Sequence, residues 1–161
     1  MIIEISKLSE DGAYFSGEEG AEVLNVEEEP DIKAKSPVSY ELFVQLVSHQ
    51  LVVKGKISTT VEVECSRCTH FFSTMLEDSS FLRAYELPEG TETIDLTEDL
   101  REAVLLQLPG FPVCGSECKG LCPICGQDLN KSNCACKPQE LVGRWNVLDG
   151  LEIQEKGPDS K

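Results

Sequence analysis

Alternation of apolar and polar positions dominates the middle of the chain. In the run 51–65, every odd position except Gly55 carries Leu, Val, Ile, Thr or Cys, while the even positions from 54 onward carry Lys, Ser, Thr or Glu. A period of two places successive side chains on opposite faces of a strand. The sequence therefore predicts a half-buried strand over 51–65, and weaker alternation predicts two more over 38–48 and 70–85.

Helical spacing follows an acidic stretch. Residues 86–99 contain six acidic and no basic side chains, which indicates an exposed connection. Apolar residues then recur every three or four positions, which predicts a helix over 97–108 that covers the sheet. Asp95 or Thr97 would cap its N-terminus, and the Pro109-Gly110 pair would end it.

The two ends of the chain are less clearly patterned. Residues 9–37 are rich in Gly, Glu, Asp and Pro, and they indicate a loop or a loosely attached strand. A short helical pattern ends at Gly150. The expected fold is α+β, with an acidic antiparallel-sheet domain and its covering helix at 1–110, a Cys-rich zinc-binding module with a short helix at 111–150, and a frayed tail at 151–161.

Length and hydropathy limit the class of protein. A chain of 161 residues fits one compact domain, or one domain with a small appended module. Its apolar runs are far shorter than the roughly 20 residues needed to span a bilayer. The N-terminus lacks the basic and apolar regions of a secretory signal, so a cytoplasmic protein is expected.

Charge is distributed unevenly along the chain. The formal net charge is −15, and residues 1–100 hold 21 acidic against 7 basic side chains, whereas residues 101–136 hold 3 of each. Gripping phosphates requires a basic face, so direct binding of naked RNA or DNA is disfavoured. The acidity fits a basic protein partner, although solubility alone would also explain it.

Eight cysteines carry the clearest chemical signal. Clustered short spacings without a secretory signal favour metal binding over disulfides. The run Cys122-Pro-Ile-Cys125-Gly126 is typical of a zinc knuckle, because the two-residue gap lets both thiolates face one ion. The expected metal ligands are Cys114, Cys118, Cys122, Cys125, Cys134 and Cys136. Six cysteines exceed the four that one zinc takes, so one Zn²⁺ or two are expected.

The separate pair Cys65 and Cys68 leaves two interpretations open. These thiols would join the pair at 114–118 to form a second zinc site, with all eight cysteines in two sets of four, or they would act as a redox dithiol. Redox motifs of this spacing open a helix, whereas this one ends a strand, so metal is favoured. Nearby, His70 is either a ligand or a packed side chain, and Arg67 either docks a carboxylate or phosphate or is an exposed turn residue.

No catalytic constellation stands out. The chain has two histidines, and it contains no G-x-S-x-G, H-E-x-x-H or phosphate-loop motif. A set of cysteines alone is typical of a closed structural zinc site, and neither ferredoxin spacing matches. The protein is therefore expected not to be an enzyme.

Several motifs together resemble one family. They are Val63-Glu-Cys-Ser-Arg-Cys68, the run from Ile94 to Pro109, the run Val113 to Asn130 with Lys-Gly-Leu-Cys-Pro and Asp-Leu-Asn, Cys134-Ala-Cys136, and Gly143-Arg-Trp-Asn-Val-Leu148. Over residues 38–148 the chain is similar to the YceD family, whose members are called large ribosomal RNA subunit accumulation proteins. By this resemblance, all eight cysteines of the chain correspond to the cysteine motifs of that family.

The resemblance implies a bacterial or organellar factor that supports processing or accumulation of large-subunit ribosomal RNA, without an enzymatic activity. Charge adds our own expectation that the partner is a basic ribosomal protein or a large-subunit assembly intermediate. The acidic residues expected to meet it are Glu27, Glu28, Glu29, Glu86, Glu89 and Glu92. The alternatives are a zinc-binding interaction module with another client and a thiol oxidoreductase using Cys65 and Cys68.

Overall fold

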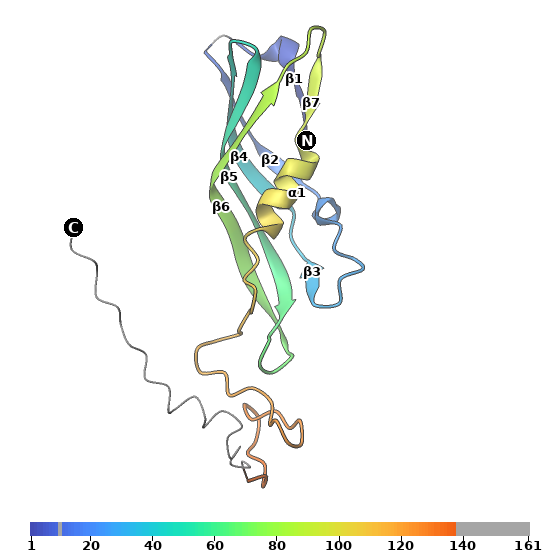
Figure 1. Cartoon of the computed structure of the whole chain (residues 1–161), viewed down its shortest axis with the longest axis vertical. Helices are drawn as coiled ribbons and strands as arrows, with labels where there is room; N and C mark the ends of the chain where they lie inside the picture. Colours follow the sequence, from blue (N-terminus) through green and yellow to red (C-terminus); the bar gives the residue numbers. More distant parts are fainter. Residues whose placement is uncertain (10, 138–161) are drawn as a thin grey trace, which may run out of the picture.

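The computed structural model describes residues 1–9 and 11–137, and Figure 1 shows their arrangement. The long strands run along the longest axis of the molecule, and the cysteine-rich segment lies beyond one end of the sheet. The helix predicted within 138–150 and the tail predicted at 151–161 lie outside the described residues. The proposed domain boundaries therefore stay predictions.

Antiparallel strands make up most of the regular secondary structure in the described residues. The main sheet contains β2 (Ala13–Glu19), β3 (Ile32–Ala34), β4 (Val38–Val47), β5 (Gln50–Glu64) and β6 (Phe71–Glu86). The central strand is β5, which pairs with β6 along one side and with β4 and then β3 along the other. The three predicted strands and their antiparallel order are confirmed.

The predicted alternation on β5 matches its burial. Its inward side chains have no exposed surface at Leu51, Val53, Ile57 and Val61. They pack against α1 (Thr97–Leu105), the one α-helix among the described residues, which crosses the inner face of the sheet in Figure 1. The hydrophobic core therefore lies between the sheet and this helix.

The helix is three residues shorter than predicted at its C-terminal end. After Leu105 the backbone tightens into turns, in which the N–H of Gln107 donates to the Val104 carbonyl at 3.0 Å. Pro109 has no N–H to donate to the Leu105 carbonyl and disfavours helical backbone at Leu108, so the helix does not continue to the predicted end at 108. At the other end, the Asp95 carboxylate accepts the Thr97 N–H at 3.0 Å, and this partnership with Thr97 holds the pKa of Asp95 below its usual range.

The N-terminal region is more ordered than the sequence indicated. The loop or loosely attached strand expected at 9–37 contains β2, which pairs with β4 over seven residues, and β3. Two short 3₁₀ helices flank β2: η1 (Ile5–Lys7) precedes it and η2 (Ala21–Leu24) follows it. The strand alternative is therefore confirmed for β2, whose pattern is weak because glycine and glutamate occupy edge-strand positions where larger apolar residues would mark a strand.

A second, small sheet corrects another expectation. The exposed connection predicted at 86–99 contains β7 (Thr93–Asp95), which pairs with β1 (Ile2–Glu4). Ile3 of this pair is 1% exposed and belongs to the core. The start of the chain therefore covers part of the hydrophobic core. None of the helices in residues 1–9 and 11–137 has the length and apolar character needed to cross a membrane.

Candidate metal centres

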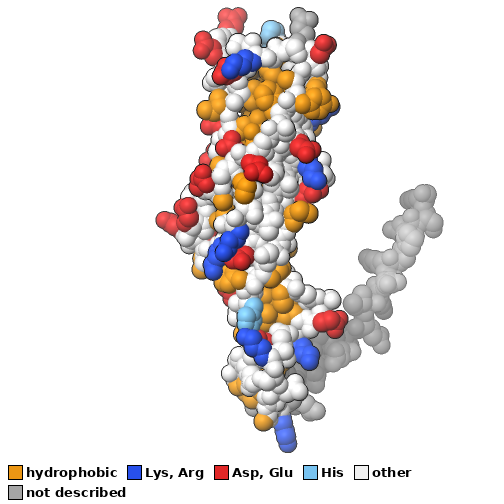
Figure 2. Space-filling model, turned by 180° about the vertical axis from the view of Figure 1, so that it is seen from behind, with side chains coloured by type: hydrophobic (Ala, Val, Ile, Leu, Met, Phe, Trp, Pro, Cys, Tyr) orange, Lys and Arg blue, Asp and Glu red, His pale blue; other side chains and the backbone are white. Residues whose placement is uncertain are grey.

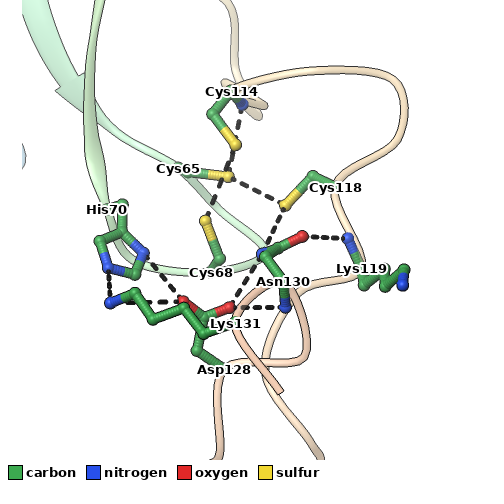
Figure 3. A network of polar contacts seen from close by, with 9 residues as sticks. All are labelled: Cys65, Cys68, His70, Cys114, Cys118, Lys119, Asp128, Asn130 and Lys131. Carbon is green, nitrogen blue, oxygen red and sulfur yellow. Dashed lines mark hydrogen bonds and ion pairs between the residues drawn. The ribbon is translucent and has the colours of Figure 1, made fainter. Parts of the chain in front are cut away.

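The turn between β5 and β6 projects beyond the core and carries the first cysteine pair. Cys65 and Cys68 are buried there, and Cys114 and Cys118 reach them from the segment that follows α1 (Figure 3). The Sγ atoms of Cys65 and Cys118 lie 3.9 Å apart, and those of Cys68 and Cys114 lie 3.7 Å apart. We call these four residues the hairpin group.

The geometry of the hairpin group fits a tetrahedral metal site. All four sulfur atoms lie within 4.8 Å of one another, and the cysteines are free thiols. A Zn–S bond of about 2.3 Å in a tetrahedron places neighbouring sulfurs about 3.8 Å apart. The observed separations of 3.7 and 3.9 Å are close to this value, so the four thiols could hold one metal ion.

A second set of four thiols, Cys122, Cys125, Cys134 and Cys136, lies in the following loop, and its sulfurs also fall within 4.8 Å of one another. We call it the knuckle group. Its first turn closes through the Gly126 N–H, which donates to the Cys122 carbonyl at 2.9 Å, and Gly126 adopts a φ of +74°. Such a φ favours glycine, so the residue after the second cysteine permits the tight turn.

The thiols of the hairpin group differ in their pKa values. Burial opposes ionisation of Cys65, but backbone N–H groups, chiefly that of Cys114, outweigh it and lower the pKa of Cys65 to about 6. Contact with Cys118 and burial raise the pKa of Cys114 to about 12. One thiol of the group ionises readily, while another keeps its proton unless a cation replaces it.

The knuckle group shows the same asymmetry. Backbone N–H groups of Cys125 and Ile124 lower the pKa of Cys122 to about 6. Contact with Cys125 raises the pKa of Cys136 to about 12. Crowded thiols that share protons in this way favour a divalent cation, because metal binding removes the repulsion between thiolates.

Backbone contacts fix the hairpin turn against the C-terminal segment. The Leu121 N–H donates to the Arg67 carbonyl at 2.8 Å, and the Ser66 N–H donates to the Pro112 carbonyl at 2.8 Å. Arg67 itself is exposed, and its guanidinium donates to the Cys118 carbonyl at 3.2 Å. The side chain of Arg67 therefore supports the segment that carries Cys118.

The structure groups the cysteines as in the first of the two interpretations drawn from the sequence, with all eight in two sets of four. Cys114 and Cys118 separate from the other four expected ligands and join Cys65 and Cys68, which gives two sets of four. His70 is in neither set, and its ring lies between Lys131, with Nε2 2.8 Å from Nζ, and Asp128, with Nδ1 3.5 Å from Oδ2.

Sequence reasoning did not single out Asp128 or Asn130 as site residues. Both contribute to the polar network beside the hairpin group in Figure 3. The Asp-Leu-Asn motif was visible in the sequence, but its side-chain contacts join segments about 60 residues apart. Only the fold shows that the motif faces the β5–β6 turn.

Comparison with known proteins adds an independent line of evidence. Residues 77–152 match the family model described as large ribosomal RNA subunit accumulation protein YceD. An uncharacterized protein of Mycobacterium tuberculosis is 32% identical over an alignment 136 positions long, and the alignment covers 74% of this chain and 62% of that protein. The chain therefore spans less than two thirds of the length of this mycobacterial relative.

Two plant relatives carry an informative name. The large ribosomal RNA subunit accumulation protein YCED homolog 1, chloroplastic, of Arabidopsis thaliana is 38% identical over 67 residues, which are 42% of this chain and 21% of that protein. Its namesake of Zea mays is 39% identical over 57 residues, 35% and 20% of the two chains. No solved structure matches. The predicted resemblance is confirmed over residues 77–152, which match the YceD family model.

Proposed function

We propose that this protein is a non-enzymatic factor in the formation of the large ribosomal subunit and that it acts by binding a basic ribosomal protein or assembly intermediate. The observation that carries the role is the family match, because the family description and two plant relatives name accumulation of large-subunit ribosomal RNA. The partner class follows from the net charge of −15.

The acidic residues named from the sequence are available to a partner. Glu27, Glu28 and Glu29 lie in the loop between η2 and β3, and Glu86, Glu89 and Glu92 lie at the connection from β6 to β7. All six are exposed, and none forms an ion pair with another described residue. Exposed, unpaired carboxylates steer a basic partner more effectively than carboxylates already paired.

The face of the sheet opposite α1 offers apolar anchors. One row across it runs from Tyr14 through Phe43 and Lys54 to Leu82, each paired with the next on a neighbouring strand. Tyr14 is 86% exposed and its ring centroid lies 4.8 Å from that of Phe43. Figure 2 shows apolar side chains on the back of the molecule, with acidic side chains and several Lys or Arg side chains among them. Apolar anchors within a charged surround are typical of a protein-binding surface.

Zinc is the metal that we propose for both thiol groups. Soft thiolate ligands select Zn²⁺, and four cysteines are typical of a closed structural site. Residues of the hairpin group would tie the β5–β6 turn to the segment after α1, and the knuckle group would close the following loop. When bound, the ion supplies folding energy where its ligands lie.

The experiment measures association with purified basic proteins of the large subunit. Reversing Glu86, Glu89 and Glu92 to Lys should lower the association rate about tenfold at low salt and change dissociation less. The matched control changes net charge equally at scattered exposed sites, Asp11→Lys, Glu22→Lys and Glu117→Lys. If both triple variants behave like the wild type, or if no basic large-subunit protein binds, the proposed partner class is wrong.

A further inference from the structure

The side chain of Asn130 lies directly against the hairpin group (Figure 3). Its Nδ2 donates to the Cys118 sulfur at 3.6 Å, and its Oδ1 accepts the Lys119 N–H at 2.8 Å. Both ends of the amide therefore contact the segment that supplies Cys118. A donor aimed at a thiolate ligand offsets part of its negative charge, and such partners orient the ligands of metal sites.

Asp128 holds Asn130 in this position. Its Oδ1 accepts both the backbone N–H and the side-chain Nδ2 of Asn130, each at 2.9 Å. Its other oxygen, Oδ2, faces His70 at 3.5 Å and Lys131 at 3.6 Å. The Asp128 side chain is only 13% exposed, so its carboxylate fixes the amide and also links the loop to the β6 end of the hairpin turn.

The loop that carries Asp128 and Asn130 connects cysteines of the knuckle group. Both residues lie between Cys125 and Cys134 in the chain, within the stretch that the second set of thiols encloses. The Cys122 N–H donates to the Gln127 carbonyl at 2.8 Å, which sets the start of this loop beside the knuckle turn. An ion held by these four thiols would restrain the loop at both of its ends.

We propose that metal binding at the knuckle group strengthens metal binding at the hairpin group and that Asn130 is the positioning residue that couples them. An ion at the knuckle group orders the loop, and Asn130 then holds Cys118 where the hairpin group needs it. The coupling is reciprocal, because each ion stabilises the arrangement that the other requires. This inference rests on the proposed occupancy of both groups by zinc.

The test titrates the reduced, metal-free full chain with Co²⁺ and then Zn²⁺ against a competing chelator, with thiolate-to-metal absorption as the readout. Asn130→Ala should weaken binding at the hairpin group about 10-fold when the knuckle group is loaded, and by reciprocity it should weaken the knuckle group by the same factor only when the hairpin group is loaded. Asn133→Ala removes the same amide from the same loop at a position without a hydrogen bond to the hairpin group, and it should leave both affinities unchanged.

A second arm measures the coupling itself. Replacing Cys125 and Cys136 with Ser disables the knuckle group and should lower the hairpin-group affinity about 10-fold, within the usual range of coupling between sites. In an Asn130→Ala background the same cysteine replacements should cost less than twofold. Circular dichroism of each variant checks that the sheet stays folded.

Three outcomes separate the possibilities. Binding of two ions with hairpin-group affinity unaffected by the loss of the knuckle group would overturn the coupling. Equal coupling with and without Asn130 would assign it to the backbone contact between Leu121 and Arg67 and overturn the role of Asn130. Failure of either group to bind metal would refute the proposed zinc occupancy, and the inference with it.

Discussion

Gly120 shows how closely the segment after α1 approaches the β5–β6 turn. Its φ is +72°, and a Cβ at this position would lie 2.9 Å from the Arg67 carbonyl oxygen. Neither the backbone conformation nor the contact tolerates a side chain well. The glycine therefore permits the Leu121–Arg67 hydrogen bond that joins the two segments of the hairpin group.

Replacing Gly120 with Ala should destabilise the attachment of the hairpin turn by about 1–2 kcal/mol, since an L-residue is strained in this conformation. Weaker metal retention by the hairpin group, measured against a chelator, would report the change. Gly115→Ala is the matched control, because a Cβ there meets nothing within 4 Å. Equal behaviour of the two variants would show that the contact at Gly120 has no energetic role.

Tyr85 joins β6 to the helix. Its hydroxyl donates to Asp99, which also accepts Arg83 at 3.2 Å. Burial and this hydrogen bond raise the pKa of Tyr85 above its usual value near 10. Because the pKa is higher in the folded protein, unfolding above pH 10 releases a proton, and the contribution of Tyr85 is complete below pH 10 and declines as pH rises further.

Tyr85→Phe should lower the free energy of unfolding by about 1 kcal/mol at pH 8, the usual size of one lost hydrogen bond. The difference from the wild type should shrink between pH 10 and 11, where the wild-type tyrosine ionises on unfolding. Urea unfolding of the variant and the wild type at pH 8 and at pH 11 measures this difference in the free energy of unfolding. Tyr14→Phe, at an 86% exposed ring, should show no such difference at either pH.

At the scale of elements, the strength of the local pattern decided what could be predicted. β5 was predictable because most of its inward positions are large and aliphatic and most of its outward positions are polar or charged. The edge strand β2 has inward Gly17 and outward Tyr14, so its alternation is weak and its order comes from pairing with β4. The pairing of β1 with β7 joins residues about 90 positions apart, which no local pattern encodes.

The same distinction applies to the cysteines. Knuckle-group ligands span 15 residues, and the spacing of Cys122 and Cys125 already indicated a shared ion. Hairpin-group ligands are separated by up to 53 residues, from Cys65 to Cys118, so the sequence could state that set only as one alternative. Its assembly depends on the length of β5 and β6, which carry the turn past the helix to the later segment.

Loss of one knuckle-group ligand should affect the loop that the knuckle group closes and leave the sheet unchanged. Cys125→Ser should remove one zinc ion per chain and make residues 122–136 sensitive to protease, while the sheet stays folded, because structural zinc stabilises the chain only where its ligands lie. Native mass spectrometry and limited proteolysis measure the two effects. Ser116→Ala should retain both ions. Unfolding of the sheet in Cys125→Ser would instead make the two parts one cooperative unit.

At the scale of the whole molecule, the two ends differ in net charge. Most of the acidity lies in residues 1–100, which form the sheet and the start of α1, whereas residues 101–136 carry equal numbers of acidic and basic side chains. Four thiolates around a divalent ion would add two negative charges at each metal group. Metal loading would therefore add negative charge to the cysteine end, whose side chains are otherwise balanced in charge.

Binding to naked large-subunit ribosomal RNA should accordingly be weak and nearly independent of salt. A protein that neutralises phosphates loses affinity on a log–log plot with a slope of about one for each phosphate, and this chain offers no cluster of Lys and Arg to produce such a slope. Binding to a basic large-subunit protein should instead weaken as salt screens the acidic surface. Fluorescence anisotropy with labelled RNA and labelled protein between 50 and 300 mM salt compares the two directly. Tight, steeply salt-dependent RNA binding by the zinc-loaded chain that persists when Glu86, Glu89 and Glu92 are reversed to Lys would contradict the charge argument and would identify the RNA itself as the partner.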